Sequence, residues 1–212
     1  MDLIEQIKKE AETFHKNSKG SHGWDHTLRV YNLCLHIGKI ENANLEILQL
    51  SSLLHDIARS YEDKSKGQIC HAKKGAELAE KILSKYNLEE EKIKKISHCI
   101  NTHRSRGDNI PLTKEAKILF DADKLDAMGA VGLGRIFLFA GEIGSKLHDK
   151  NIDINNSEEY SKDDTAYREY LIKIRFLKDR MLTNEGKKLA KERHEFMANF
   201  FDRMNKEVDG EI

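Results

Sequence analysis

A histidine–aspartate pair in this 212-residue chain has residue types that bind divalent metal ions. His55 and Asp56 are adjacent and follow a leucine-rich stretch, residues 48–54. Polar groups at the buried end of a helix are costly to leave unpaired, and a metal ion would satisfy both at once. Neighbours on a helix lie about 100° apart, so both side chains can reach one ion. For this pair taken alone, a structural or surface role is the alternative interpretation.

A second acidic cluster, LFDADKLDA over residues 119–127, carries three carboxylates, Asp121, Asp123 and Asp126. Flanked by apolar residues, these carboxylates cannot all be buried without partners. Asp123 and Asp126 are spaced i, i+3 and are expected on one helix face, whereas Asp121 points elsewhere. One or two of them can be ligands or can orient water, while the others support the ligands. Helix capping explains an isolated Asp-Ala-Asp equally well.

Helices must position these residues. The chain has one proline and 7% aromatic residues, which permits long helices and weakens the case for an all-β fold. Asp25 is a candidate N-cap for the helix that carries His26 in its first turn. Residues 59–68 are polar and predict a loop, and residues 144–164 predict a long surface loop, a lid or a partly mobile segment. Apolar periodicity predicts helices over about residues 1–15, 25–40, 44–56, 70–86, 89–103, 116–123, 131–143 and 185–207.

Charge and cysteine content narrow the classes of function and location. The chain has 36 basic and 36 acidic residues, so it lacks the overall basic surplus of a non-specific nucleic-acid binder. Three cysteines without a CxxC pair do not form a disulfide framework or a thiolate zinc site. No segment resembles a signal peptide or reaches the about 18 apolar residues that span a bilayer. We therefore expect a cytoplasmic protein without nucleic-acid or membrane partners.

The order of these motifs resembles the HD-domain superfamily of metal-dependent phosphohydrolases, and most closely its small stand-alone hydrolases. That family has a histidine on one helix, then a His-Asp pair, then an aspartate on a later helix. Here these positions are His26, His55 with Asp56, and Asp123. The resemblance covers nearly the whole chain, through residues 21–26 (SHGWDH), 121–127 (DADKLDA), 181–183 (MLT) and 188–193 (KLAKER).

The resemblance implies an all-α fold: a single-domain, HD-type helical bundle over residues 1–212 with a central metal site. Its core motifs would lie in about residues 20–140, with a C-terminal helical extension over about 165–207. A divalent ion (Mn, Mg, Fe, Co, Ni or Zn) would be held by His26, His55, Asp56 and Asp123. Asp123 is preferred over Asp121 because it has the family's Ala-Asp-basic-Leu context.

Further site residues follow from position and resemblance. His71 and His103 can hold a second metal ion or line the pocket and bind phosphate, and both interpretations stay open. His98 precedes His103 by five residues and points to another face, which makes it the weaker candidate. Lys124 is expected to act beside Asp56 in catalysis. Candidate substrate contacts are His22, Arg59 and Arg104, while His15, His36, His148 and His194 are expected to be structural or surface residues.

The expected activity is metal-dependent hydrolysis of a phosphoester or phosphoanhydride by metal-activated water. A small phosphorylated substrate, with a nucleotide as the leading candidate, is expected from the family's range of substrates. The alternative is a non-catalytic HD sensor module that binds metal and nucleotide without turnover. A homodimer formed through exposed helices is a further open possibility.

Overall fold

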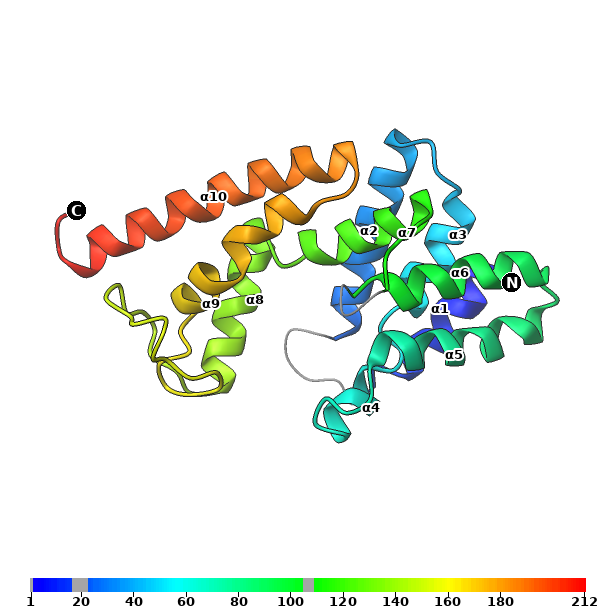
Figure 1. The fold of residues 1–212 in the computed structure, drawn as a ribbon, viewed down its shortest axis with the longest axis horizontal. Helices are drawn as coiled ribbons and strands as arrows, with labels where there is room; N and C mark the ends of the chain where they lie inside the picture. Colours follow the sequence, from blue (N-terminus) through cyan, green and yellow to red (C-terminus); the bar gives the residue numbers. More distant parts are fainter. Residues whose placement is uncertain (1, 17–22, 105–108) are drawn as a thin grey trace. The chain divides into compact units, whose positions relative to one another are not determined.

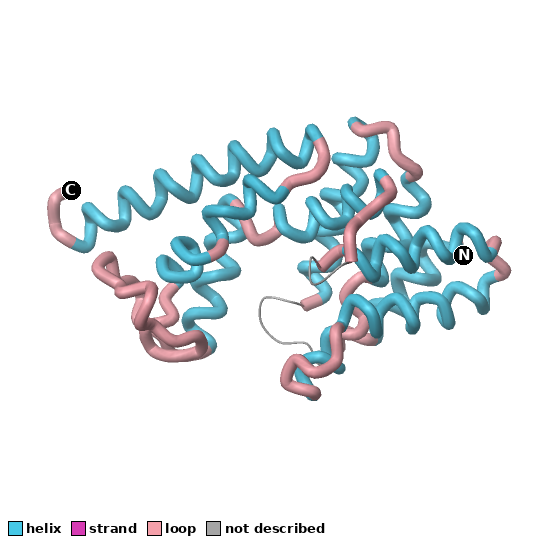
Figure 2. Tube along the Cα trace, in the orientation of Figure 1, coloured by secondary structure: helices cyan, strands magenta, loops and turns pink. Residues whose placement is uncertain are grey.

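The computed structural model describes residues 2–16, 23–104 and 109–212 and divides the chain into two compact units, Met1–Asp123 and Lys124–Ile212. Helices are the only regular elements in the described residues (Figures 1 and 2), which confirms the all-α prediction. The expectation of a single domain over residues 1–212 stays a prediction. Among these helices, none combines the length and apolar character needed to cross a membrane.

The first unit holds the helices that carry the candidate site residues. Along the chain they are α1 (Leu3–Thr13), α2 (Trp24–Ile40), α3 (Leu45–Leu54), α4 (Arg59–Lys64), α5 (His71–Leu83), the 3₁₀ turn η2 (Ser84–Tyr86), α6 (Glu90–Thr102) and α7 (Lys114–Leu125), the last of which continues two residues into the second unit.

Helix α3 lies at the centre of the first unit and packs against α1, α2 and α6. Asn44 caps its start, where the side-chain oxygen accepts a hydrogen bond from the Ile47 amide at 3.1 Å. Leu50 and Leu54 on α3 are fully buried, as are its other leucines from Leu48 onward. Because α3 ends inside this core, the residues that follow it, His55 and Asp56, are also buried.

The start of α2 differs from the expected cap. Gly23 is the N-cap residue, and Asp25 lies inside the first turn. The Asp25 carboxylate instead pairs with Arg29 one turn later, at 2.6 Å. The predicted Asp25 cap is therefore wrong, although His26 does lie in the first turn as expected.

The segment between α3 and α5 also differs from the expectation. Residues 59–68 were predicted as a loop, but Arg59–Lys64 forms the short helix α4, and only the residues after it form a turn. The chain then enters α5, which comes very close to the end of α3. A Cβ added at Gly75 would lie 3.3 Å from the His55 carbonyl oxygen. A glycine at this position therefore lets α5 approach His55.

The second unit comprises α8 (Gly129–Glu142), α9 (Ala166–Ile172), the 3₁₀ helix η3 (Ile174–Arg180) and α10 (Asn184–Val208). The Arg193 guanidinium on α10 donates to the Leu125 carbonyl at the end of α7 at 2.6 Å, and the same carbonyl also accepts from the Met128 amide at 3.0 Å. Residues 144–164 contain no helix, as predicted. Buried Arg168 holds this segment through Asp164 and Ser157. A lid function for the segment stays a prediction.

We expect Gly132→Ala to lower the free energy of unfolding by about 1–3 kcal/mol, because a Cβ there would lie 2.3 Å from the Ala127 carbonyl oxygen. Gly134→Ala is the matched control on the same helix, since nothing lies within 4 Å of its added Cβ. That control should gain about 0.5–1 kcal/mol from the better helix propensity of alanine. Urea unfolding measures both, and equal effects of the two substitutions would contradict the packing at Gly132.

Candidate metal centre

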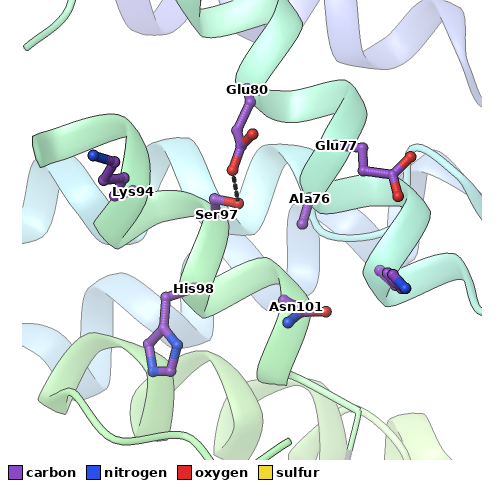
Figure 3. A pocket seen from close by; sticks show the side chains of 8 residues that line it. Ala76, Glu77, Glu80, Lys94, Ser97, His98 and Asn101 are labelled. Atoms are coloured by element: carbon purple, nitrogen blue, oxygen red, sulfur yellow. Dashed lines mark hydrogen bonds between the residues drawn. The ribbon is translucent and has the colours of Figure 1, made fainter. Parts of the chain in front are cut away.

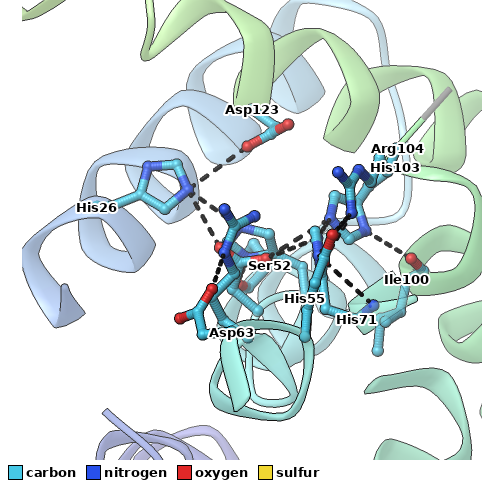
Figure 4. A network of polar contacts seen from close by, with 12 residues as sticks. His26, Ser52, His55, Asp63, His71, Ile100, His103, Arg104 and Asp123 are labelled. Carbon is cyan, nitrogen blue, oxygen red and sulfur yellow. Dashed lines mark hydrogen bonds and ion pairs between the residues drawn. The ribbon is translucent and has the colours of Figure 1, made fainter. Parts of the chain in front are cut away.

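Six side chains at the ends of five helices of the first unit converge in its interior, and Figure 4 shows five of them labelled. Each lies at or near a helix end, where the chain enters or leaves the core. They are His26 in the first turn of α2, His55 and Asp56 directly after α3, His71 at the start of α5, His103 directly after α6, and Asp123 near the end of α7.

His26, His55 and Asp123 form a first group whose ligand atoms all lie within 4.8 Å of one another. The His26 Nε2 atom is 3.4 Å from an Asp123 oxygen and 3.4 Å from the His55 Nε2 atom. Both histidines are buried, while Asp123 is half-buried. Two imidazole nitrogens and one carboxylate oxygen at this spacing can hold a divalent ion.

Asp56, His71 and His103 form a second group, in which all three residues are buried. The His71 Nε2 atom lies 3.2 Å from an Asp56 oxygen and 3.1 Å from the His103 Nε2 atom. His103 Nε2 is 3.7 Å from the same Asp56 oxygen. The structure thus brings together the two histidines for which the sequence left a metal or a phosphate role open.

Asp56 connects the two groups because its carboxylate oxygens face in different directions. Oδ1 is the oxygen nearest to His71 and His103, at 3.2 and 3.7 Å. Oδ2 lies 3.7 Å from His26 Nε2 and 3.9 Å from His55 Nε2. A carboxylate in this position can contribute one oxygen to each group, which is the arrangement of a bridging ligand.

The helix ends determine which ring nitrogen of His55 and His103 faces the groups. His55 Nδ1 lies 2.7 Å from the Ser52 carbonyl, and His103 Nδ1 lies 2.6 Å from the Ile100 carbonyl. A carbonyl only accepts hydrogen bonds, so each Nδ1 must carry the proton. The Nε2 lone pair is then directed toward the other ligand atoms. Partners of this kind hold metal-binding histidines in one tautomer and one orientation.

Burial and neighbouring charges keep these groups in the forms that bind metals. Burial lowers the pKa of His55 to about 4, so its ring is neutral at pH 7. Burial also lowers the pKa of His71. Desolvation alone would raise the pKa of Asp56, but the surrounding histidines, His55 first and then His103, His71 and His26, hold it well below its usual value. Neutral imidazoles beside an ionised carboxylate form a ligand set for a cation.

Glu62 on α4 is part of the site and was missed by the sequence reasoning. Its buried carboxylate accepts a hydrogen bond from His71 Nδ1 and pairs with Arg104, at 2.6 Å for one of the two contacts. Desolvation would raise the pKa of Glu62, but Arg104 and His71 lower it to about 2. Glu62 therefore does for His71 what the two backbone carbonyls do for the other histidines. Its segment was predicted as a loop, and no local pattern pairs it with a residue nine positions later.

The other predicted site residues are placed as follows. His22 lies outside the described residues. Arg59 is half-buried on α4, 3.6 Å from Asp63, and its charge contributes to the low pKa of His71. Arg104 contacts Glu62, so its guanidinium is already paired. Lys124 is half-buried and directly follows Asp123 in the last turn of α7.

The remaining acidic and histidine candidates lie in neither group. Asp121 is fully buried, and Asp126 pairs with Arg135 at 2.7 Å. Helix α7 ends at Leu125, so the expected shared helix face of Asp123 and Asp126 does not exist. His98 lines a separate groove of about 340 Å³ between α5 and α6 (Figure 3), where it accepts a hydrogen bond from the Leu112 amide.

The sequence profile of the HD domain family matches residues 23–128, the stretch that contains both groups. This chain belongs to the HD domain family. HD domains bind divalent metal ions, and the two His/Asp groups are residues of this HD domain that can hold them. The identity of the ion and the individual ligand roles stay predictions.

Relatives of this HD domain protein extend over almost its full length. Bacillus subtilis YpgQ, described as an uncharacterized protein, is 31% identical over 211 residues, which cover 97% of this chain and 94% of YpgQ. The crystal structure of YpgQ in complex with ADP has a TM-score of 0.76 at 29% identity and covers 98% of this chain and 99% of that one. A Bacillus thuringiensis HD-superfamily hydrolase has a TM-score of 0.76 at 27% identity, with 97% and 96% covered. These similarities support a hydrolase in general terms.

We expect Glu62→Gln to weaken metal binding by the group of Asp56, His71 and His103 about 10- to 100-fold, because the neutral amide holds the His71 ring less firmly. Titration of the metal-free protein with Mn²⁺ measures this affinity. Glu77→Gln on α5 is the matched control, since Glu77 is exposed and pairs only with Lys74 among the described residues. Unchanged Mn²⁺ affinity in the Glu62 variant would refute a positioning role for this carboxylate.

Proposed function

We propose that this protein is a metal-dependent phosphohydrolase that acts on a nucleotide or a similar small phosphoester. The observation that carries the proposal is the position of Asp56 between two pairs of histidines. One of its carboxylate oxygens is near the Nε2 atoms of His26 and His55, and the other is near those of His71 and His103. In the HD domain family, such ligand sets accompany hydrolysis at phosphorus, and relatives that match nearly the whole chain are described as hydrolases.

In this proposal, His26, His55, Asp123 and Asp56 would hold the first ion. A bound divalent ion lowers the pKa of water and offsets negative charge on phosphoryl oxygens. Asp56 keeps a negative charge between the two groups because the surrounding histidines lower its pKa. Lys124, directly after Asp123, is the proposed cationic residue for the reacting phosphate, and half-buried Arg59 is a further candidate contact.

For His71 and His103, the tautomers favour a second ion over direct phosphate binding. His103 Nδ1 donates to a backbone carbonyl and His71 Nδ1 donates to Glu62, so Nε2 is the nitrogen of each ring that can present a lone pair. A lone pair attracts a cation and repels a phosphate oxygen. We therefore propose that Asp56, His71 and His103 hold a second divalent ion, with Asp56 shared between the two.

A nucleotide is the proposed substrate class. The support is a relative: YpgQ, with a TM-score of 0.76 over nearly the whole length of both chains, has been crystallised with ADP. The net charge of this chain is zero, so an anionic substrate would be attracted by the local charge of the ions and nearby cationic residues rather than by the whole surface.

Asp56→Ala should remove both metal binding and phosphate release, because Asp56 is the residue that contacts both groups. The test is a hydrolysis screen of nucleoside mono-, di- and triphosphates and generic phosphoesters with metal-free protein plus Mn, Mg, Co, Ni or Zn. Asp209→Ala, at an exposed carboxylate after α10, is the control that should keep activity. Full activity of the Asp56 variant would refute the mechanism. Bound metal without turnover of any substrate would favour the sensor module.

Mn²⁺ should also stabilise the metal-free protein, because a ligand that binds only the folded state shifts the unfolding equilibrium. Free Mn²⁺ at 100 times its Kd should add about 2.7 kcal/mol per site, which thermal unfolding detects as a rise in Tm. Elemental analysis of the loaded protein should find close to two ions per chain. A single ion per chain would refute the second site, and a Tm independent of Mn²⁺ would refute both.

A further inference from the structure

Two helices of the second unit, α8 and α10 (Figure 1), pack against each other and expose large apolar side chains. On α8 these are Val131, 41% exposed, and Leu138, 51% exposed; on α10 they are Phe196, 50% exposed, and Phe200, 37% exposed. The Phe137 ring on α8 links the two helices, with its centroid 5.9 Å from that of Phe200. An isolated exposed apolar residue is ordinary, but a cluster on neighbouring helices indicates a contact site for a partner. We call these five residues the α8/α10 face.

Helix α8 carries almost no charge. Arg135 is the only charged residue from Gly129 to Gly141, and it pairs with Asp126 at 2.7 Å. Charged residues make up 34% of the chain, and the outer side of a surface helix is normally where they lie. The outer side of α8 is apolar instead, so covering it with a protein surface lowers the free energy.

The outer side of α10 has a pattern of charged and apolar residues that is complementary to itself. Five exposed residues lie within an arc of about 100° around the helix. They are Glu192, Phe196, Asn199, Phe200 and Arg203. The acidic residue precedes the two phenylalanines, and the basic residue follows them. The midpoint between Glu192 and Arg203 lies within one residue of the midpoint between Phe196 and Phe200.

An antiparallel second copy of α10 would match this pattern. A two-fold axis near residue 198 brings Phe196 opposite Phe200 of the second copy, and Glu192 to within about 1.5 Å along the helix of the level of Arg203. Glu192 has no ion pair within 4 Å among the described residues, and Arg203 pairs only with exposed Glu207, one turn away on its own helix. The use of one patch by both subunits is the arrangement of a two-fold dimer.

We propose that the α8/α10 face is the interface of a homodimer, in which α10 packs antiparallel against α10 of a second copy and α8 contributes the apolar margin. The sequence left a homodimer through exposed helices open, and this face gives it a location. The inference does not depend on the proposed function, because this association needs neither metal nor substrate.

Sedimentation of the full-length protein over a range of concentrations at low salt measures the Kd of the dimer. Phe196→Glu should raise this Kd at least about 30-fold, because it places a charge against Phe200 of the second copy. Leu112→Glu is the matched control, since Leu112 is a 73% exposed leucine of the first unit, and it should leave the Kd unchanged. Circular dichroism verifies that both variants keep their helices.

Charge reversal tests the antiparallel arrangement. Glu192→Arg and Arg203→Glu should each raise the Kd of the dimer about tenfold, because each turns two attractive contacts into two repulsive ones. An equimolar mixture of the two variants should associate about as tightly as the unmodified protein, since each chain then meets opposite charges on the other. Recovery in the mixture also shows that both variants are folded.

A monomer at every concentration would overturn the inference. A dimer whose Kd is unchanged in Phe196→Glu would do the same, because its interface would then lie elsewhere. If the mixture of Glu192→Arg and Arg203→Glu associates no more tightly than either variant alone, the antiparallel pairing of α10 is wrong.

Discussion

The buried carboxylate of Asp56 is the constraint around which the first unit is organised. Removing an ionised carboxylate from water is costly unless positive charge or hydrogen-bond donors surround it. Here the surrounding groups are histidine rings delivered by α2, α5 and the residues after α3 and α6. Neutral imidazoles compensate the charge only in part, whereas a divalent cation would do so fully. The burial of Asp56 therefore makes metal binding and the packing of these helices mutually dependent.

The ends of helices provide much of the preorganisation. The last carbonyls of an α-helix have no partner within the helix. His55 and His103 each directly follow a helix and donate Nδ1–H to the carbonyl three residues earlier. One hydrogen bond thus satisfies a helix end and fixes the orientation of a ring. His71 lies at the start of its helix, where no such carbonyl is available, and its Nδ1–H is bound by Glu62 instead.

Because this chain belongs to the HD domain family, the two His/Asp groups are expected to bind divalent metal ions. The charge of such ions would attract anionic ligands to the site. The chain carries no net charge, so its attraction for a phosphorylated ligand must be local. Ions held by His26, His55 and Asp123, and by Asp56 with its two other histidines, would create that local positive field.

The sequence by itself determined the helical class, most helix positions, the HD family resemblance and the six side chains that converge. These depend on local periodicity and on residue types with few stable alternatives when buried. Only the tertiary structure decided how those residues pair. It placed Glu62 on a short helix against His71, gave Asp25 to Arg29 rather than to a cap, and separated Asp126 from Asp123 by ending α7 at Leu125. It also buried His15 against Trp24. The physical reason is that pairing depends on the distances between side chains after the helices pack, and the linear order of residues does not contain those distances.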